Sequence, residues 1–153
     1  MRLRLTRRIA RCFGAPVTKR QTERLLNEIG QLLAEDTDYP LDGTLLHAEV
    51  GRMFVAPSIF KDLGDHILYR SPDLDRLGDT LLDLWQAQGS GKRWVEIEYV
   101  IRGDEFAAVF VYPDEIDPDE EPLSRRRRIV SRHFGNKPIK YPQPDGSYRL
   151  ISE

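Results

Sequence analysis

The sequence predicts an α+β fold, in which an antiparallel sheet with a central hairpin is flanked by three helices. Three observations predict it. Apolar residues recur at helical spacing in three separate segments, and segments with strand-like alternation lie between them. Two of the strand-like segments are joined by a tight Gly-Asp turn. The regular βαβ alternation that a doubly wound parallel sheet requires is missing.

The first predicted helix runs from about Lys19 to Glu35, where leucine and isoleucine recur every three or four residues. Thr18 is a suitable N-cap, and Gln21 completes a capping box. Strand-like alternation then begins at Gly43 and continues or restarts at residues 53–55. Pro57 is expected to interrupt it because proline has no amide hydrogen to donate.

From residue 66 onward, further strand-like and helical segments follow one another. Ser71 and Pro72 predict a helix start, with serine as the N-cap and proline in the first helical position. Trp85 and Trp94 lie in apolar segments and are predicted to be in the core. The remaining predicted elements are a strand at 66–70, a hairpin formed by 93–102 and 105–112, a helix at 123–134 ended by Gly135, and a last short strand at 148–151.

One strand of the hairpin carries two acidic residues on a single face. In 93–102, alternation places Ile97 and Tyr99 on one side and Glu96 and Glu98 on the other. Carboxylates on an amphipathic strand are usually solvated, so this face of the sheet is expected to be in contact with water.

Length and composition describe one domain with a charged surface. The 153 residues are enough to bury a core without disulfides or metal, and 31% of them are charged. The one cysteine, Cys12, excludes an intrachain disulfide framework. No apolar stretch reaches the roughly 18 residues of a transmembrane segment. The chain is therefore divided into a basic leader, 1–16, and a single α+β domain, 17–153.

The net charge of −2 hides a strong asymmetry. Residues 1–22 contain seven Lys or Arg and no acid, a charge of +7, so the rest of the chain, with 16 bases and 25 acids, carries −9. The acidic body favours basic partners, whereas the leader favours phosphate or an anionic membrane.

The leader allows several interpretations. Leu5, Ile9 and Phe13 form one stripe of a helix surrounded by arginine. It is compatible with an amphipathic helix on an anionic surface, a nucleic-acid arm or a processed segment, or more plainly with a helix packed on the body or a disordered tail.

Catalytic signatures are missing from the sequence. It contains no Gly-rich phosphate loop, HExxH, GxSxG or CxxC pattern, and its three histidines lie in different predicted elements. We therefore predict that the protein is not an enzyme and has no catalytic, cofactor or metal site. A small hydrolase that uses Glu96, Glu98 or His66 is a less favoured hypothesis.

An acidic segment before the last helix is the most distinctive polar feature. Its carboxylates either favour the N-terminus of that helix and pair with its arginines, or form a docking surface for a basic protein, or bind metal, although the spacing is not that of an EF-hand. The predicted partner-binding residues are Asp114, Glu115, Asp117, Asp119, Glu120 and Glu121.

The run Arg125–Arg128 directly follows these acids. Four arginines suggest nucleic acid, but adjacent carboxylates repel phosphate and no aromatic residue is interleaved, so a solvated helix face is favoured. An adaptor that binds nucleic acid or an anionic membrane through residues 2–11 and Arg125–Arg128 is the alternative function.

Several short motifs follow one another in order between about Leu46 and Pro142. HAEV at 47–50 is followed by DTLLDLWQ at 79–86, WVEIEYVI at 94–101, FAAVFVYPDE at 106–115, HFG at 133–135 and KYP at 140–142. In the order of these motifs the chain resembles the YezG-like immunity proteins of bacterial polymorphic-toxin systems.

The resemblance implies a cytoplasmic protein that binds and blocks a cognate toxin domain, often a nuclease, and takes no small-molecule substrate. A nuclease surface attracts phosphate and is therefore usually basic, so an acidic inhibitor associates with it quickly and occludes it. We expect the partner to be basic and the mechanism to be electrostatic and steric occlusion without chemistry.

Overall fold

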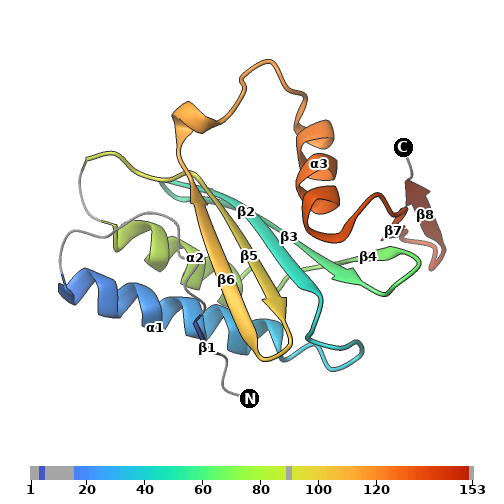
Figure 1. Cartoon of the computed structure of the whole chain (residues 1–153), viewed down its shortest axis with the longest axis horizontal. Coiled ribbons are helices and arrows are strands. Elements are labelled where there is room, and N and C mark those ends of the chain that lie inside the picture. Colours follow the sequence, from blue (N-terminus) through green and yellow to red (C-terminus); the bar gives the residue numbers. More distant parts are fainter. Residues whose placement is uncertain (1–3, 6–15, 89–90, 152–153) are drawn as a thin grey trace.

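The computed structural model describes the backbone of residues 4–5, 16–88 and 91–151, with side chains from residue 19 onward in these ranges (Figure 1). Eight strands form one mixed sheet in the order β1-β6-β5-β2-β3-β4-β7-β8. The strands are β1 (Arg4–Leu5), β2 (Thr44–Gly51), β3 (Phe54–Asp62), β4 (Ile67–Arg70), β5 (Glu96–Arg102), β6 (Glu105–Val111), β7 (Ile139–Pro142) and β8 (Tyr148–Ile151). The helices are α1 (Pro16–Leu33), α2 (Arg76–Gln86), α3 (Pro122–Phe134) and the short 3₁₀ helix η1 (Pro113–Glu115).

The α+β class and the three α-helices agree with prediction, but the sheet is not purely antiparallel. Strands joined by short turns, such as β2–β3 and β5–β6, pair antiparallel, whereas β1 pairs with β6 and β4 with β7 in parallel. The parallel pairs join segments that are far apart in the chain, and such pairs leave no local pattern in the sequence. The predicted hairpin β5–β6 also lies to one side, since β2 and β3 occupy the middle of the sheet.

Helices α1 and α2 cover one face of the sheet, and the larger apolar core lies between them and the sheet. Leu26 from α1, Leu81 from α2 and Trp94 before β5 are fully buried there. The Tyr99 hydroxyl donates a hydrogen bond of 2.8 Å to the Leu26 carbonyl, which satisfies the only polar atom of that buried side chain. Trp85 packs against the same core, so both tryptophans lie where the sequence predicted them.

Helix α3 covers the opposite face with a smaller core. Ile129, Val130 and Phe134 of α3 pack with Leu45 and Phe60 of the sheet. The molecule therefore has three layers, with the sheet between α1 and α2 on one side and α3 on the other (Figure 1).

The start of α2 differs from the prediction. The helix begins at Arg76 rather than at Ser71, and the Asp73 carboxylate accepts hydrogen bonds of 3.1 Å from the backbone N–H groups of Asp75 and Arg76. Asp73 thus satisfies N–H groups at the helix N-terminus, the role expected for Ser71.

Pro57 does not interrupt the sheet but lies within β3, opposite Ala48 of β2. Strand β4 pairs only with Ile59–Asp62 of β3, so no described strand pairs with the other side of β3 at Pro57. A proline is tolerated there because no amide hydrogen is required on an open side.

Little of the predicted leader lies within the described residues. Arg4 and Leu5 form β1 beside β6 rather than part of a helix. Ile9, Cys12 and Phe13 lie outside the described residues.

Candidate functional site

A cluster of charged side chains lies between the sheet and α3, in addition to the apolar core on that side. The register of β2 and β5 places His47 opposite Glu98 on the face that α3 covers. Helix α3 turns arginine and histidine side chains toward these carboxylates, so the two elements are joined by ion pairs as well as by apolar contacts. The members of this charge cluster are His47, Glu96, Glu98, Arg125, Arg132 and His133, and all of them except the half-exposed Arg132 are buried or mostly buried.

Glu96 is 3% exposed and is bound by two partners. Arg125 donates to it from Nε at 3.1 Å and from Nη2 at 2.6 Å, and His47 Nε2 lies 3.1 Å from Oε1. Burial alone would raise the pKa of Glu96, but the hydrogen bonds and charges of His47 and Arg125 outweigh it and lower the pKa. Glu96 is therefore an ionised carboxylate inside the molecule.

Glu98 forms the second half of the cluster and is 4% exposed. His133 Nε2 lies 2.8 Å from its Oε1, and Arg132 Nη2 donates to the same oxygen. Burial would raise its pKa, but the hydrogen bonds from His133 and Arg132 dominate and lower the pKa to about 2. Both glutamates thus hold α3 on the sheet.

The expectation that Glu96 and Glu98 face solvent is wrong, and so is the outward orientation of Arg125. The strand alternates as predicted, but α3 covers its polar face, and Arg125 is only 9% exposed. Strand periodicity assigns residues to faces but does not say whether a helix covers them. The signal that was missed is charge complementarity between this face of the strand and the arginine-rich helix.

The hydrolase hypothesis gains no support from this arrangement. Acid–base catalysis by two carboxylates needs one of them to hold a proton near neutral pH, but the pKa is lowered for both Glu96 and Glu98. His66, the third residue of that hypothesis, forms a contact of 2.6 Å with Asp65, whose side chain is 90% exposed.

The acidic segment between β6 and α3 is held by several contacts. Asp114 pairs with Lys92 at 3.0 Å, and the Glu115 carboxylate accepts a hydrogen bond from the Tyr112 N–H at the start of η1. Glu120 binds Arg128 through both oxygens at 2.9 Å, which is the predicted pairing with the arginines of the next helix. These residues therefore have a structural function, whatever they bind.

The other acids of this segment extend into solvent. Asp117, Asp119 and Glu121 are all exposed. Their hydrogen bonds are local, from the Asp119 N–H to Asp117 Oδ1 and from the Ser124 hydroxyl to Glu121. This part of the predicted docking surface is available to a partner.

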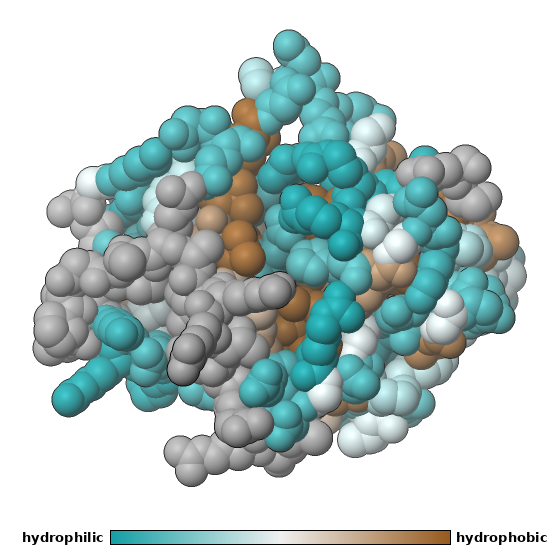
Figure 2. Space-filling model, in the orientation of Figure 1, coloured by the Kyte–Doolittle hydropathy of each residue, from teal (hydrophilic) through white to brown (hydrophobic). Residues whose placement is uncertain are grey.

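A groove of about 350 Å³ lies between the acidic segment, the start of α3 and the ends of β2, β3 and β5. Its charged residues are four acids, Glu49, Glu96, Asp117 and Glu120, and one base, Arg125. Figure 2 shows hydrophobic residues exposed in a strip between β6 and α3, with strongly hydrophilic residues beside it. In the groove itself, acidic and apolar residues lie together on the α3 side of the sheet. The apolar residues of the groove are Val50, Phe54, Val95, Ile116, Pro118 and Pro122.

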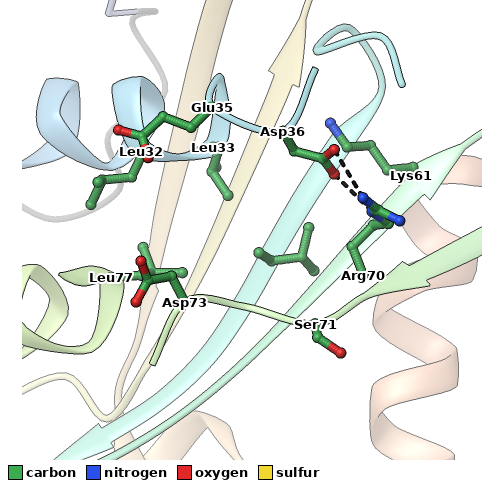
Figure 3. Close-up of a pocket in the computed structure, with 10 residues that line it drawn as sticks. Leu32, Leu33, Glu35, Asp36, Lys61, Arg70, Ser71, Asp73 and Leu77 are labelled. Carbon is green, nitrogen blue, oxygen red and sulfur yellow. Dashed lines mark hydrogen bonds and ion pairs between the residues drawn. The ribbon is translucent and has the colours of Figure 1, made fainter. Parts of the chain in front are cut away.

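A second pocket, of about 280 Å³, lies on the opposite side of the sheet, near the end of α1 (Figure 3). Asp36 and Arg70 point toward each other at one end, in hydrogen bonds of 2.8 and 3.0 Å, with Lys61 beside them. Asp73 lies on the far side and serves the N-terminus of α2. These two carboxylates of the pocket are thus bound to groups of the protein itself.

Lys61 is the most unusual residue of this pocket, because it is only 1% exposed. Its ammonium donates hydrogen bonds to the Thr44 hydroxyl at 2.9 Å and the Pro40 carbonyl at 3.1 Å. Burial lowers the pKa of Lys61. No sequence pattern singled this lysine out, although strand alternation places it on the same face as Ile59, which is in the core.

We expect the aliphatic part of Lys61, rather than its charge, to stabilise the fold. Lys61→Met keeps the volume and removes a charge whose burial is costly, so its unfolding free energy should stay within about 1.5 kcal/mol of the unmodified protein. Lys61→Ala leaves a cavity and should lose about 2–5 kcal/mol in urea denaturation. Equal losses in the two variants would show that the ammonium is the stabilising group.

Among the described residues, no group of three or more His, Cys, Asp or Glu side chains could hold a metal ion. Nor does any helix in this part of the chain have the length and apolarity needed to cross a membrane. No protein-family model matches the sequence, and no curated protein matches it.

Proposed function

We propose that this protein binds a basic partner protein and blocks it, as an immunity protein neutralises its cognate toxin. The observation that carries the proposal is the acidic, partly apolar surface on the α3 side, where four carboxylates and one arginine line a groove. In this proposal the protein occludes its partner in the cytoplasm and performs no chemistry.

Charge supports a basic partner. Outside the first 22 residues the chain carries a net charge of −9. Such a body attracts cationic surfaces over about one Debye length and accelerates association with them. A toxin that acts on nucleic acid presents a cationic surface, which matches the class of partner that the sequence resemblance implies.

The acidic segment is also preorganised. Glu120 binds Arg128 at one end of the segment, and the carboxylate of Glu115 binds the backbone of η1 at the other end, where the exposed pair Asp114–Lys92 contributes less. A fixed segment loses less conformational entropy on binding than a mobile one. Asp119 and Glu121 are therefore exposed charges on an ordered support, with Asp117 beside them.

The test is association with a toxin domain encoded next to the gene of this protein; a neighbourhood without such a domain would count against the proposal. Asp119→Lys with Glu121→Lys should slow association about tenfold or more at low salt and flatten its salt dependence, because steering is reduced. Stopped-flow mixing measures both. Glu28→Lys with Asp79→Lys changes net charge equally on α1 and α2 and should slow association much less.

Two outcomes would contradict the proposal. If co-expression of the pair shows neither binding nor protection, the inhibitor function is wrong. If the control pair of substitutions slows association as much as the acidic-segment pair, net charge matters but the interface lies elsewhere.

The adaptor alternative rests on the +7 charge of residues 1–22. Helix α3 contributes less to it than its sequence suggested, because Arg125 and Arg128 are bound to Glu96 and Glu120. Binding to DNA, RNA or anionic vesicles with a steep salt dependence would favour this function over the inhibitor.

A further inference from the structure

We propose that the groove beside the acidic segment captures an arginine side chain of the basic partner, with Glu49 and Asp117 as its carboxylate ligands. This inference rests on the proposed function and names the recognition element within it. It follows from which groove groups are already bound, which are open, and what lies between them.

Two of the four groove carboxylates are fully used. Both oxygens of Glu96 are bound by Arg125, and both oxygens of Glu120 are bound by Arg128. Arg125 is directed to Glu96 and lies 3.8 Å from Glu120, so the one cation among the groove's described residues is neutralised by its neighbours.

The other two carboxylates have open oxygens. Within the described residues the side chain of Glu49 has no hydrogen-bond or ion-pair partner, and it is exposed. Asp117 accepts one local bond through Oδ1, from the Asp119 N–H, which leaves Oδ2 open. The unbound side-chain groups of the groove are therefore negatively charged hydrogen-bond acceptors. They repel a phosphate or a carboxylate, so the preferred ligand is a cation.

The apolar residues that line the groove favour a cation that has an apolar part and a planar part. Phe54 is 52% exposed where it lines the groove, and Ile116 and Pro118 lie on the side of the acidic segment. A guanidinium stacks on an aromatic ring and binds carboxylates through up to five donors, and its three methylenes pack on apolar side chains. An ammonium is more strongly hydrated and makes fewer directed bonds.

The turn before Phe54 has an unusual backbone conformation and an exposed apolar side chain, that of Met53. Met53 has φ of +56°, a conformation that is rare for residues other than glycine, asparagine and aspartate, and its side chain is 89% exposed. Exposed apolar side chains are a cost for an isolated domain. A partner that covers Phe54 when its arginine enters the groove would remove the cost of that exposed surface.

The experiment uses the full chain and N-acetyl-arginine amide as the probe, followed by chemical-shift changes in two-dimensional NMR spectra. We expect saturable, millimolar binding with the shifts centred on Phe54 and Ile116. N-acetyl-citrulline amide has nearly the same shape without the charge and should bind at least tenfold more weakly.

Matched variants locate the ligands. Glu49→Gln with Asp117→Asn should abolish arginine binding, and asparagine at 117 keeps the oxygen that accepts the Asp119 N–H. Glu28→Gln with Asp79→Asn removes the same charge from α1 and α2, away from both the groove and the acidic segment, and should leave affinity within about twofold.

Equal binding of citrulline, equal loss in the control pair, or shifts centred elsewhere would each overturn the inference. These outcomes are separable from a failure of the proposed function. If the groove does not bind arginine but the acidic-segment variants still slow toxin association, only this inference fails. If the groove binds arginine but no toxin is neutralised, the inhibitor function fails instead.

Discussion

Glu96→Ala is expected to lower the unfolding free energy by about 3–5 kcal/mol, a large effect for a polar substitution. The substitution leaves Arg125, which is 9% exposed, and His47, which is 6% exposed, without their shared carboxylate. A buried cation without its partner keeps its desolvation cost and loses the attraction that offset it. Urea denaturation at neutral pH measures the change.

The exposed pair formed by Glu35 and Arg76 supplies the control. It has the same two-pronged geometry, at 2.6 and 2.8 Å, but both side chains are more than half exposed. Water and salt screen it, so Glu35→Ala should be much less damaging than Glu96→Ala. Similar losses in the two variants would show that burial does not set the strength of these pairs.

A double substitution distinguishes an unpaired charge from lost packing. Glu96→Leu with Arg125→Met removes both charges and keeps most of the apolar volume. It should be more stable than Glu96→Ala alone, because no buried guanidinium is left without a partner. A double variant as unstable as the single one would mean that the ion pair itself stabilises the contact between α3 and the sheet.

Acid should destabilise the protein between about pH 4.5 and about pH 2. The pKa of Glu98 is lowered from 4.5 to about 2 in the folded protein, so the unfolded chain binds a proton first as the pH falls. The stabilisation is complete above the unfolded pKa and is lost as the pH falls through the folded pKa. The shift corresponds to about 3 kcal/mol, and Glu96 and Asp36, whose pKa values are also lowered, add to the loss.

Urea denaturation from neutral pH down to about pH 2 measures this dependence. Glu98→Gln should be less stable at pH 7, with a flatter decline in acid, because the amide has no proton to bind in this range. A flat profile for the unmodified protein across the window would contradict the assignment of Glu98 as an ionised internal group.

Local sequence patterns predicted the elements of this fold but not their arrangement. The hairpin β5–β6 and helix α3 lie within a few residues of their predicted bounds, because alternation, turn residues and capping are local signals. The pairing of β4 with β7 joins Ile67 to Ile139, and nothing in either segment specifies the other. The sheet was therefore expected to be antiparallel and is mixed.

The same distinction applies to the candidate site. The acidic segment is evident from composition alone, and its contact with Arg128 follows from proximity in the chain. The groove is not evident in this way, because it brings Glu49 of β2 together with Asp117, which lies far along the chain beyond four further strands. The exposure of Phe54 likewise depends on where α3 and the acidic segment lie, and strand alternation carries no information about that.

The order of the strands has a consequence for the solubility of shortened forms. The outermost described strands, β1 and β8, come from the two terminal regions of the chain, and each is short, with two and four residues. A short outer strand has few unpaired backbone N–H and C=O groups, so these two strands limit the pairing of the sheet edges with strands of another molecule. Removal of Arg4 and Leu5 would leave β6, which has seven residues, as the outer strand on that side, so a truncated protein would expose a longer edge to which a strand of another molecule can pair.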